Sequence, residues 1–299
     1  MALLQISELS KKYGEITAVD NVSFDVNAGE IVALIGKNGA GKTSILNCIS
    51  GNLYPTKGDV IYRNHSLLKV NSKLNEFGIL IEPNFYEYLN AYDNLKLLLQ
   101  ITGIKDKEQI NKEIIDTLKL VELLPKKNKY VKTFSFGMKQ RLGLAEAIIN
   151  NPNFLILDEP FVGLDPIGKK MLKNLILNKS KGEKAGVLFS SHDLSDVTEI
   201  CDRVVMIHKG KVVYNDKFKI TKQYSMTVNM DMGKLAGVSE MLGKNISVEG
   251  NKILFTDTEV LKLIVLKLEE QKEKILDISV KESSLYDFFE GSVLDENSD

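Results

Sequence analysis

The chain has 299 residues, of which 43% are hydrophobic, and its 39 lysines and arginines nearly balance 40 aspartates and glutamates. This length allows two domains with ordinary cores, and the near-zero net charge argues against a nucleic-acid surface or a polybasic membrane anchor. Cys48 and Cys201 lack CxxC spacing, which is typical of small core residues in a reducing compartment. The sequence shows neither a signal-peptide pattern nor an apolar run of about 18 residues, so we expect a soluble protein.

Apolar runs of strand length recur through the first 220 residues. They cover residues 3–9, 22–26, 31–35, 60–62, 77–81, 153–157, 186–190 and 203–207. Between residues 90 and 124, leucines and isoleucines repeat at helical spacing, which indicates a largely helical block. Long helical stretches also separate the later strands, a rhythm typical of a parallel sheet covered on both faces. The sequence therefore predicts an α/β fold with a parallel-sheet core.

The pattern changes after a break at about 217–223. Strands are expected over 224–230, 246–249, 252–255 and 275–280, with one helix between the first two strands and another over 258–271. This β-α-β-β-α-β order suits a small ferredoxin-like unit. We therefore divide the chain into residues 1–220 and a small α+β accessory domain over 221–299.

Residues 36–43 read GKNGAGKT, which matches the phosphate-binding pattern G-x-x-x-x-G-K-[ST]. An apolar strand precedes this loop and a helix follows it, which is the context that the motif requires. The glycines let successive N–H groups turn toward one anion, and the helix dipole adds to the same site. We expect ATP phosphates to contact Gly36, Asn38, Gly39, Ala40, Gly41, Lys42, Thr43 and Ser44. The alternative is a plain glycine turn between strand and helix.

Within this loop, Lys42 is expected to reach the β- and γ-phosphates, and the Thr43 hydroxyl to ligate Mg²⁺. Downstream, the run FLILDEP ends an apolar strand with Asp158 and Glu159. The predicted sheet brings both carboxylates beside the loop, where Asp158 would hold the Mg²⁺ shell through water. Glu159 would polarise the water that attacks the γ-phosphate. Two charges that merely end a buried strand are the alternative.

These residues, together with FSFGMKQR at 134–141, resemble the nucleotide-binding subunit of an ATP-binding-cassette (ABC) transporter over residues 1–220. The resemblance implies a P-loop NTPase of ABC type, with an N-terminal β subdomain and a helical subdomain at about 88–152. Ser135 and Gly137 would then contact the γ-phosphate of ATP bound to a second subunit. Phe136 and Met138 depart from the family's LSGGQ, and a capped helix start remains the alternative for this segment.

Three smaller matches follow from the same resemblance. GLDP at 163–166 is similar to the loop that lines the dimer seam, with Asp165 reaching across. His192, in VLFSSHD, is similar to the switch histidine that contacts the γ-phosphate. Tyr13, in KKYGE, is similar to the aromatic residue that stacks on adenine, although an exposed strand tyrosine would look the same.

Glu82 stands where the family usually has a glutamine that touches the metal and the attacking water and couples ATP to the membrane partner. The resemblance therefore implies a catalytic and metal-binding role for Glu82. This glutamate and the aromatic run after it resemble the branch that handles bacitracin, lantibiotics and related peptides. SSLYDFFEG at 283–291 also resembles the end of that branch, although an amphipathic helix explains it equally well. A surface carboxylate at a strand end is the alternative for Glu82.

The resemblance implies an ATPase motor subunit that uses ATP and Mg²⁺, lies at the inner face of the cell membrane and forms a dimer with itself or a related subunit. Its partner would be a membrane permease on a separate chain, and no nucleic acid is expected. An ABC-type ATPase acting on ribosomes or DNA is the alternative, although this chain has one cassette and a neutral charge. A P-loop kinase or GTPase would leave FSFGMKQR and GLDP without a role.

Overall fold

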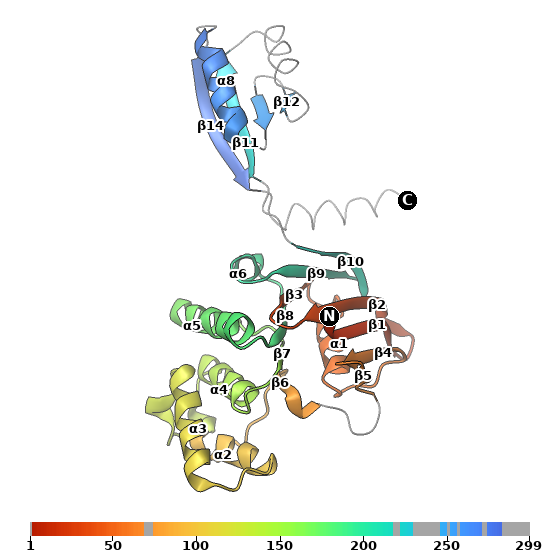
Figure 1. Cartoon of the computed structure of the whole chain (residues 1–299), viewed down its shortest axis with the longest axis vertical. Helices are drawn as coiled ribbons and strands as arrows, with labels where there is room; N and C mark the ends of the chain where they lie inside the picture. Colours follow the sequence, from red (N-terminus) through yellow and green to blue (C-terminus); the bar gives the residue numbers. More distant parts are fainter. Residues whose placement is uncertain are drawn as a thin grey trace. The chain divides into compact units, whose positions relative to one another are not determined.

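The computed structural model describes residues 2–68, 74–217, 222–229, 246–249, 252–255, 258–270 and 274–282. The chain divides into two compact units, Met1–Phe218 and Lys219–Asp299. Figure 1 shows the elements of each unit. No helix within the described ranges is both long and apolar enough to cross a membrane.

An antiparallel sheet forms the beginning of the first unit (Figure 1). Its strand order is β2-β1-β4-β5, and its strands are β1 (Ala2–Tyr13), β2 (Ile16–Asn27), β4 (Lys57–Tyr62) and β5 (His65–Ser66). A two-residue turn at Gly14, which has a φ of 56°, joins β1 to β2. A positive φ is accessible to glycine without steric cost, so the turn closes without strain.

The second sheet has the order β10-β9-β3-β8-β7-β6. Its strands are β3 (Ile31–Ile35), β6 (Phe77–Leu80), β7 (Phe154–Leu157), β8 (Gly186–Ser191), β9 (Arg203–His208) and β10 (Lys211–Asp216). All neighbouring pairs are parallel except β9 and β10. The predicted parallel-sheet core is therefore confirmed, whereas the edge strand β10, whose short apolar run lies between polar residues, escaped the sequence analysis.

Helices follow the strands of this sheet. They are α1 (Lys42–Ile49), α2 (Ala91–Ile101), α3 (Lys107–Leu120), α4 (Phe136–Ile148), α5 (Pro166–Leu177) and α6 (Leu194–Thr198). Short turns of 3₁₀ helix cover Leu74–Glu76, Leu124–Lys126 and Val131–Thr133, and a π-helical turn covers Asn178–Gly182. Polar residues start most of these helices: the side chains of Asn90, Asp106, Ser135 and Asp165 each accept a backbone N–H of the first turn.

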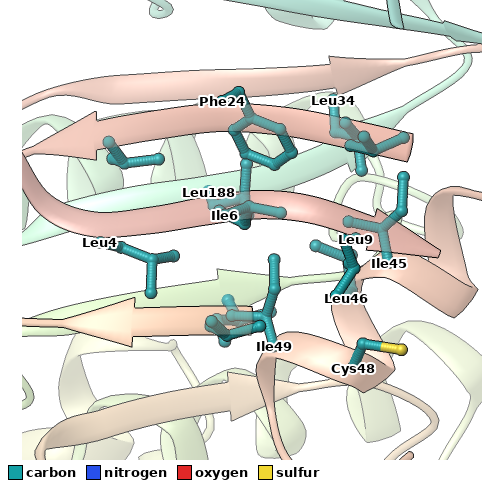
Figure 2. Close-up of a cluster of buried hydrophobic side chains, with 14 of the residues drawn as sticks. Leu4, Ile6, Leu9, Phe24, Leu34, Ile45, Leu46, Cys48, Ile49 and Leu188 are labelled. Atoms are coloured by element: carbon teal, nitrogen blue, oxygen red, sulfur yellow. The ribbon is translucent and has the colours of Figure 1, made fainter. Parts of the chain in front are cut away.

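The main hydrophobic core joins the two sheets of the first unit. Leu4 and Ile6 of β1, Leu34 of β3 and Ile45 of α1 are each 1% exposed or less and belong to one cluster. Figure 2 shows these side chains meeting between the strands and α1. Because α1 contributes to this core directly after the phosphate loop, the loop is fixed to the most rigid part of the unit.

The second unit has an antiparallel sheet of order β12-β13-β11-β14. Its elements are β11 (Lys222–Asn229), β12 (Ile246–Glu249), β13 (Lys252–Phe255), α8 (Thr258–Glu270) and β14 (Lys274–Glu282). Met226, Phe255 and Ile264 belong to its own buried core. The helix expected between the first two strands and the segment 283–291 lie outside the described residues, so the ferredoxin-like interpretation stays a prediction.

Helix α4 packs closely on β6. A Cβ at Gly78 would lie 1.9 Å from the Ala147 carbonyl oxygen, and one at Gly143 would lie 2.6 Å from Leu80. Between these contacts, burial raises the pKa of the Glu146 carboxyl to about 7. An ionised carboxylate at this position loses hydration, so the neutral acid is the favoured form in the folded chain.

Glu146→Gln should therefore stabilise the protein at alkaline pH. The folded carboxyl keeps its proton up to about pH 7, whereas the unfolded one loses it near 4.5. The stability that this proton provides is present below pH 4.5 and is lost as the pH rises through 7. We expect thermal unfolding to show a higher Tm for the variant at pH 8 and little change at pH 5. A variant Tm equal to wild type at pH 8 would contradict this, and Glu113→Gln on α3 is the control.

Candidate functional site

Four neighbouring strands end at one edge of the parallel sheet. Ile35 pairs with Ser191, Leu157 pairs with Phe189, and Leu80 pairs with Leu157. Because these strands are parallel, the segments that follow them leave from the same edge. The phosphate loop, Asp158–Glu159, His192 and Glu82 are those segments, so the sheet brings the main sequence-predicted residues to one place.

The phosphate loop depends on two glycines. Gly41 has a φ of 107°, and a Cβ there would lie 2.4 Å from the Ala18 carbonyl oxygen. A Cβ at Gly36 would lie 2.5 Å from the Ile207 carbonyl oxygen. Lys42 begins α1, is 6% exposed, and donates to the Gly36 carbonyl at 2.7 Å. The loop thus carries a buried ammonium at a helix N-terminus, which suits an anion.

The rest of the loop frames this ammonium. Ala40 is buried, whereas Asn38 and Gly39 are exposed and Gly39 has a φ of 82°. Ser44, in the first turn of α1, lies 3.5 Å from the Tyr13 hydroxyl. Tyr13 is 45% exposed, and the Lys11 ammonium lies 5.3 Å from the centre of its ring. An exposed aromatic face therefore lies beside the loop.

Asp158 is tied to the loop and to β8. The Thr43 hydroxyl donates to its Oδ2 at 2.8 Å, and the Ser190 hydroxyl donates to its Oδ1. Both oxygens of this carboxylate are therefore fixed by hydroxyl groups. Among the described residues, no three His, Cys, Asp or Glu side chains gather closely enough to hold a metal by themselves. One carboxylate and one hydroxyl are nevertheless the kind of oxygen ligands that Mg²⁺ takes beside phosphates and water.

Glu159 links the loop to His192. Its Oε1 lies 3.4 Å from the Lys42 ammonium, and its Oε2 lies 2.8 Å from Nδ1 of His192. Its backbone N–H donates to the Ser190 hydroxyl at 2.8 Å, and its φ is 44°. A glutamate with a positive φ is uncommon, and such residues concentrate at functional sites. The carboxylate is held at both oxygens and remains 26% exposed.

Glu82 occupies the equivalent position on the next strand. It follows the paired residue Leu80 by two positions, as Glu159 follows Leu157, and its φ is 45°. The Asp158 N–H donates to the Leu80 carbonyl at 2.7 Å, which fixes the spacing between the two segments. Glu82 is exposed at the same sheet edge.

The start of α4 is bound to the segment that follows Glu159. A Cβ at Gly137 would lie 2.7 Å from the Gly163 carbonyl oxygen, and one at Gly163 would meet the Phe136 ring at 2.2 Å. Ser135 caps α4 through the Met138 N–H, at 3.3 Å. The sequence-predicted Ser135 and Gly137 thus lie beside the GLDP loop of their own chain, with the Phe136 ring 62% exposed.

Asp165 ends the same segment and caps α5. Its Oδ1 accepts the Gly168 N–H at 2.9 Å and an Arg141 N–H at 3.0 Å. The bond from Gly168 lowers the pKa of the Asp165 carboxyl, and Arg141 adds to this effect. Asp165 is therefore an ionised, exposed carboxylate whose position is fixed by α4.

A cavity of about 220 Å³ borders Glu159 and His192. The other residues that line it are Phe161, Val162, Gly163, Leu164, Lys169, Ser191, Asp193 and Asp196. Water can therefore reach Glu159 from the side of the GLDP loop.

The sequence analysis missed two residues that position these groups. Ser190, fully buried, binds both Asp158 and the Glu159 backbone. Gln140 on α4 is also buried and donates to the Pro160 carbonyl at 3.4 Å. Ser190 lies two residues before His192 in VLFSSHD, so its place at the strand end was a usable signal. Nothing local marks Gln140, because its partner is twenty residues away in sequence.

Comparisons with known proteins agree on one family. Residues 19–162 match the model of a family described as ABC transporter. The lantibiotic transport ATP-binding protein SrtF of Streptococcus pyogenes is 37% identical over 77% of this chain and 94% of its own. The bacitracin transport ATP-binding protein BcrA of Bacillus licheniformis is 37% identical over 74% and 72%. The dimeric cassette MJ0796, solved in a post-hydrolysis state bound to ADP and Pi, is 26% identical with a TM-score of 0.67, over 72% and 99%.

Ser190→Ala should lower activity without unfolding the chain. The variant leaves the Glu159 N–H without its acceptor and removes a hydroxyl from Asp158, a bond to a charged group that contributes roughly 1.5–3 kcal/mol. We expect ATP turnover, measured by phosphate release, to fall roughly tenfold or more. Wild-type turnover in a folded variant would show that Ser190 does not position the carboxylates.

Ser180→Ala is the matched control for removing a buried hydroxyl. Within the described part of the chain, the Ser180 hydroxyl is buried without a hydrogen-bond partner. Its removal should therefore leave turnover unchanged and the Tm equal or slightly higher.

Proposed function

Because this chain belongs to the ABC transporter family and is an ATP-hydrolysing subunit of it, we propose that it powers a separate membrane permease that moves peptide antibiotics. The cargo rests on two relatives, whose names describe lantibiotic and bacitracin transport. An ABC-type ATPase acting on ribosomes or DNA is not favoured by these relatives. A neutral net charge is also unlike that of a nucleic-acid-binding protein.

The observation that carries the chemistry is the position of Glu159 between Lys42 and His192. The Glu159 carboxylate is the general base and takes a proton from the attacking water. Lys42 and the N–H groups of residues 36–44 hold the phosphates, where positive charge stabilises the charge that develops in the transition state. His192 orients Glu159 through Nδ1 and contacts the γ-phosphate.

Thr43 and Asp158 fit a magnesium ion. Their oxygens lie 2.8 Å apart at the end of the phosphate loop, and both are hard oxygen donors. Mg²⁺ bound there would neutralise charge on the β- and γ-phosphates. Asp158 keeps its orientation through Ser190, so the site does not depend on the ion for its shape.

Two copies of the site would work as a pair. Ser135 and Gly137 stand at the N-terminus of α4, where a hydroxyl and backbone N–H groups bind an anion. We infer that they contact the γ-phosphate of ATP bound by the loop of a second subunit, with Asp165 at the seam. Tyr13 stacks on the adenine of its own subunit.

Glu159→Gln should preserve ATP binding and abolish turnover. The amide keeps the size of the side chain but cannot take a proton, so phosphate release should fall by roughly 10²-fold or more. Size-exclusion chromatography with ATP should then show an accumulated dimer. The control is Glu199→Gln, which also removes a carboxylate paired with a lysine. Unchanged turnover in Glu159→Gln would show that Glu159 is not the general base.

Glu82 variants test the coupling to the permease. An ionised carboxylate accepts hydrogen bonds but cannot donate them, so it differs from an amide toward any partner. In the complex purified with its permease, Glu82→Gln should keep ATP binding and a folded dimer and lower the permease-stimulated rate of hydrolysis. Glu82→Ala should lower stimulation further.

Three outcomes would contradict this proposal. Stimulation equal to wild type in both variants would leave Glu82 without a role in coupling. A tagged wild-type chain that purifies from membranes without any multi-span partner would contradict the permease. Unchanged bacitracin and lantibiotic susceptibility in cells lacking the chain would contradict the cargo.

A further inference from the structure

An ion-pair network joins two helices that begin beside the candidate site. α5 starts after Asp165, and the Lys169 N–H donates to the Asp165 carbonyl at 2.9 Å. The Lys169 ammonium lies 2.6 Å from Oδ2 of Asp196 on α6 and 3.9 Å from Oδ2 of Asp193. A second lysine of α5, Lys173, lies 3.2 Å from Oδ1 of Asp196. Both oxygens of the Asp196 carboxylate are therefore held by lysines of α5.

The Asp196 carboxylate is the buried centre of this network. Asp196 is 3% exposed, whereas the side chains of Lys169 and Lys173 are 33% and 15% exposed. A carboxylate removed from water needs charged partners, because the loss of one leaves a buried charge uncompensated. Burial lowers the pKa of the Lys173 ammonium, but its bonds to Glu199 and Asp196 raise this pKa by more, so Lys173 stays charged. The network thus differs from an exposed ion pair, which contributes little.

The network ends at the turn that carries His192. This turn lies between Ser191, the last residue of β8, and the start of α6. The Asp193 N–H donates to the Ser191 hydroxyl at 3.0 Å, and Oδ1 of Asp193 accepts the Ser195 N–H at 2.9 Å. The bonds from Ser195 lower the pKa of the Asp193 carboxyl, and the charge on Lys169 adds to this effect. Asp193 therefore caps α6 and is attracted to α5 as an ionised carboxylate.

His192 depends on this turn for its position. The His192 side chain is 50% exposed, so packing around the ring does not fix it. Its Nδ1 lies 2.8 Å from Oε2 of Glu159, and a hydrogen bond weakens steeply when its geometry is lost. α6 has five residues, which are too few to form a stable helix by themselves. The contacts between α6 and α5 therefore help to set the position of the His192 ring.

We propose that Lys169 is a positioning residue for ATP hydrolysis, which keeps His192 in contact with Glu159. It does so by anchoring Asp193 and Asp196 to the first turns of α5. The His192 turn is thereby held to the segment that follows GLDP as well as to β8. This inference rests on the proposed function, because Lys169 acts only through His192.

The first experiment removes the charge from Lys169 and keeps the length of its stem. We expect kcat of Lys169→Met, measured by phosphate release, to fall about tenfold, because a small displacement of a catalytic group costs this much or more. KM for ATP should stay within about twofold of wild type, since Lys169 lies outside the phosphate loop. Lys169→Arg keeps the charge and the donors, and should restore most of kcat.

Lys170→Met is the matched control for this experiment. It removes the same charge from an exposed position one residue along α5, and should have wild-type kcat. Equal losses in Lys169→Met and Lys170→Met, or no restoration by Lys169→Arg, would overturn the proposal.

The second experiment asks whether Lys169 acts through His192. Lys169→Met, His192→Ala and the double variant are compared in a double-mutant cycle, with thermal unfolding to show that each is folded. Lys169 has nothing to position once His192 is alanine, so the double variant should have the kcat of His192→Ala. A purely structural role would lower kcat by the same factor in both backgrounds, and this result would overturn the proposal. Lys169→Gln, which can still donate to Asp196, takes the place of Lys169→Met in the cycle if that variant unfolds.

The positioning role and the proposed function fail separately. Wild-type turnover in His192→Ala would contradict the role of His192 in the proposed mechanism. A low kcat in His192→Ala beside a wild-type kcat in Lys169→Met would overturn the role of Lys169 alone.

Discussion

The candidate site depends on the parallel pairing of β6, β7 and β8. This register places Leu80, Leu157 and Phe189 side by side, so the two or three residues after each strand must converge. The Ser190 hydroxyl then holds Asp158 and the Glu159 backbone to the end of β8. A slip of one residue in either pairing would turn every following side chain to the other face. The chemistry is therefore fixed by buried strands rather than by the loops that display it.

The backbone of Glu82 and of Glu159 is strained. Both adopt a left-handed backbone conformation two residues past a strand end, which for an L-residue costs roughly 1–3 kcal/mol. The surrounding hydrogen bonds, including the one between Asp158 and the Leu80 carbonyl, outweigh this cost. The two glutamates with proposed roles thus share this conformation at equivalent register positions.

Local signals predicted most of the fold and the loop chemistry. The fully buried runs β3, β7 and β8 were found because a parallel strand buried on both faces is apolar throughout. β10 was missed because a half-exposed edge strand offers only weak alternation. The partners of Gln140 and Arg141 could not be predicted, since both contacts join residues about twenty positions apart through the packing of α4. The positive φ of Glu159 could not be predicted either, because a glutamate does not favour this conformation.

The two glycines of the phosphate loop connect that loop to distant segments. Gly41 lies against the Ala18 carbonyl, and so does Gly210, whose own N–H donates to Ala40. The strand β2 and the turn between β9 and β10 thus pack against the loop and restrict its conformation. Neither segment carries a residue with a proposed chemical role. The shape of the phosphate loop therefore depends on three separate segments of chain. A methyl group added at Gly210 would therefore distort the phosphate loop, although Gly210 is not part of it. For the same reason, the loop sequence placed alone in another protein would not keep this conformation.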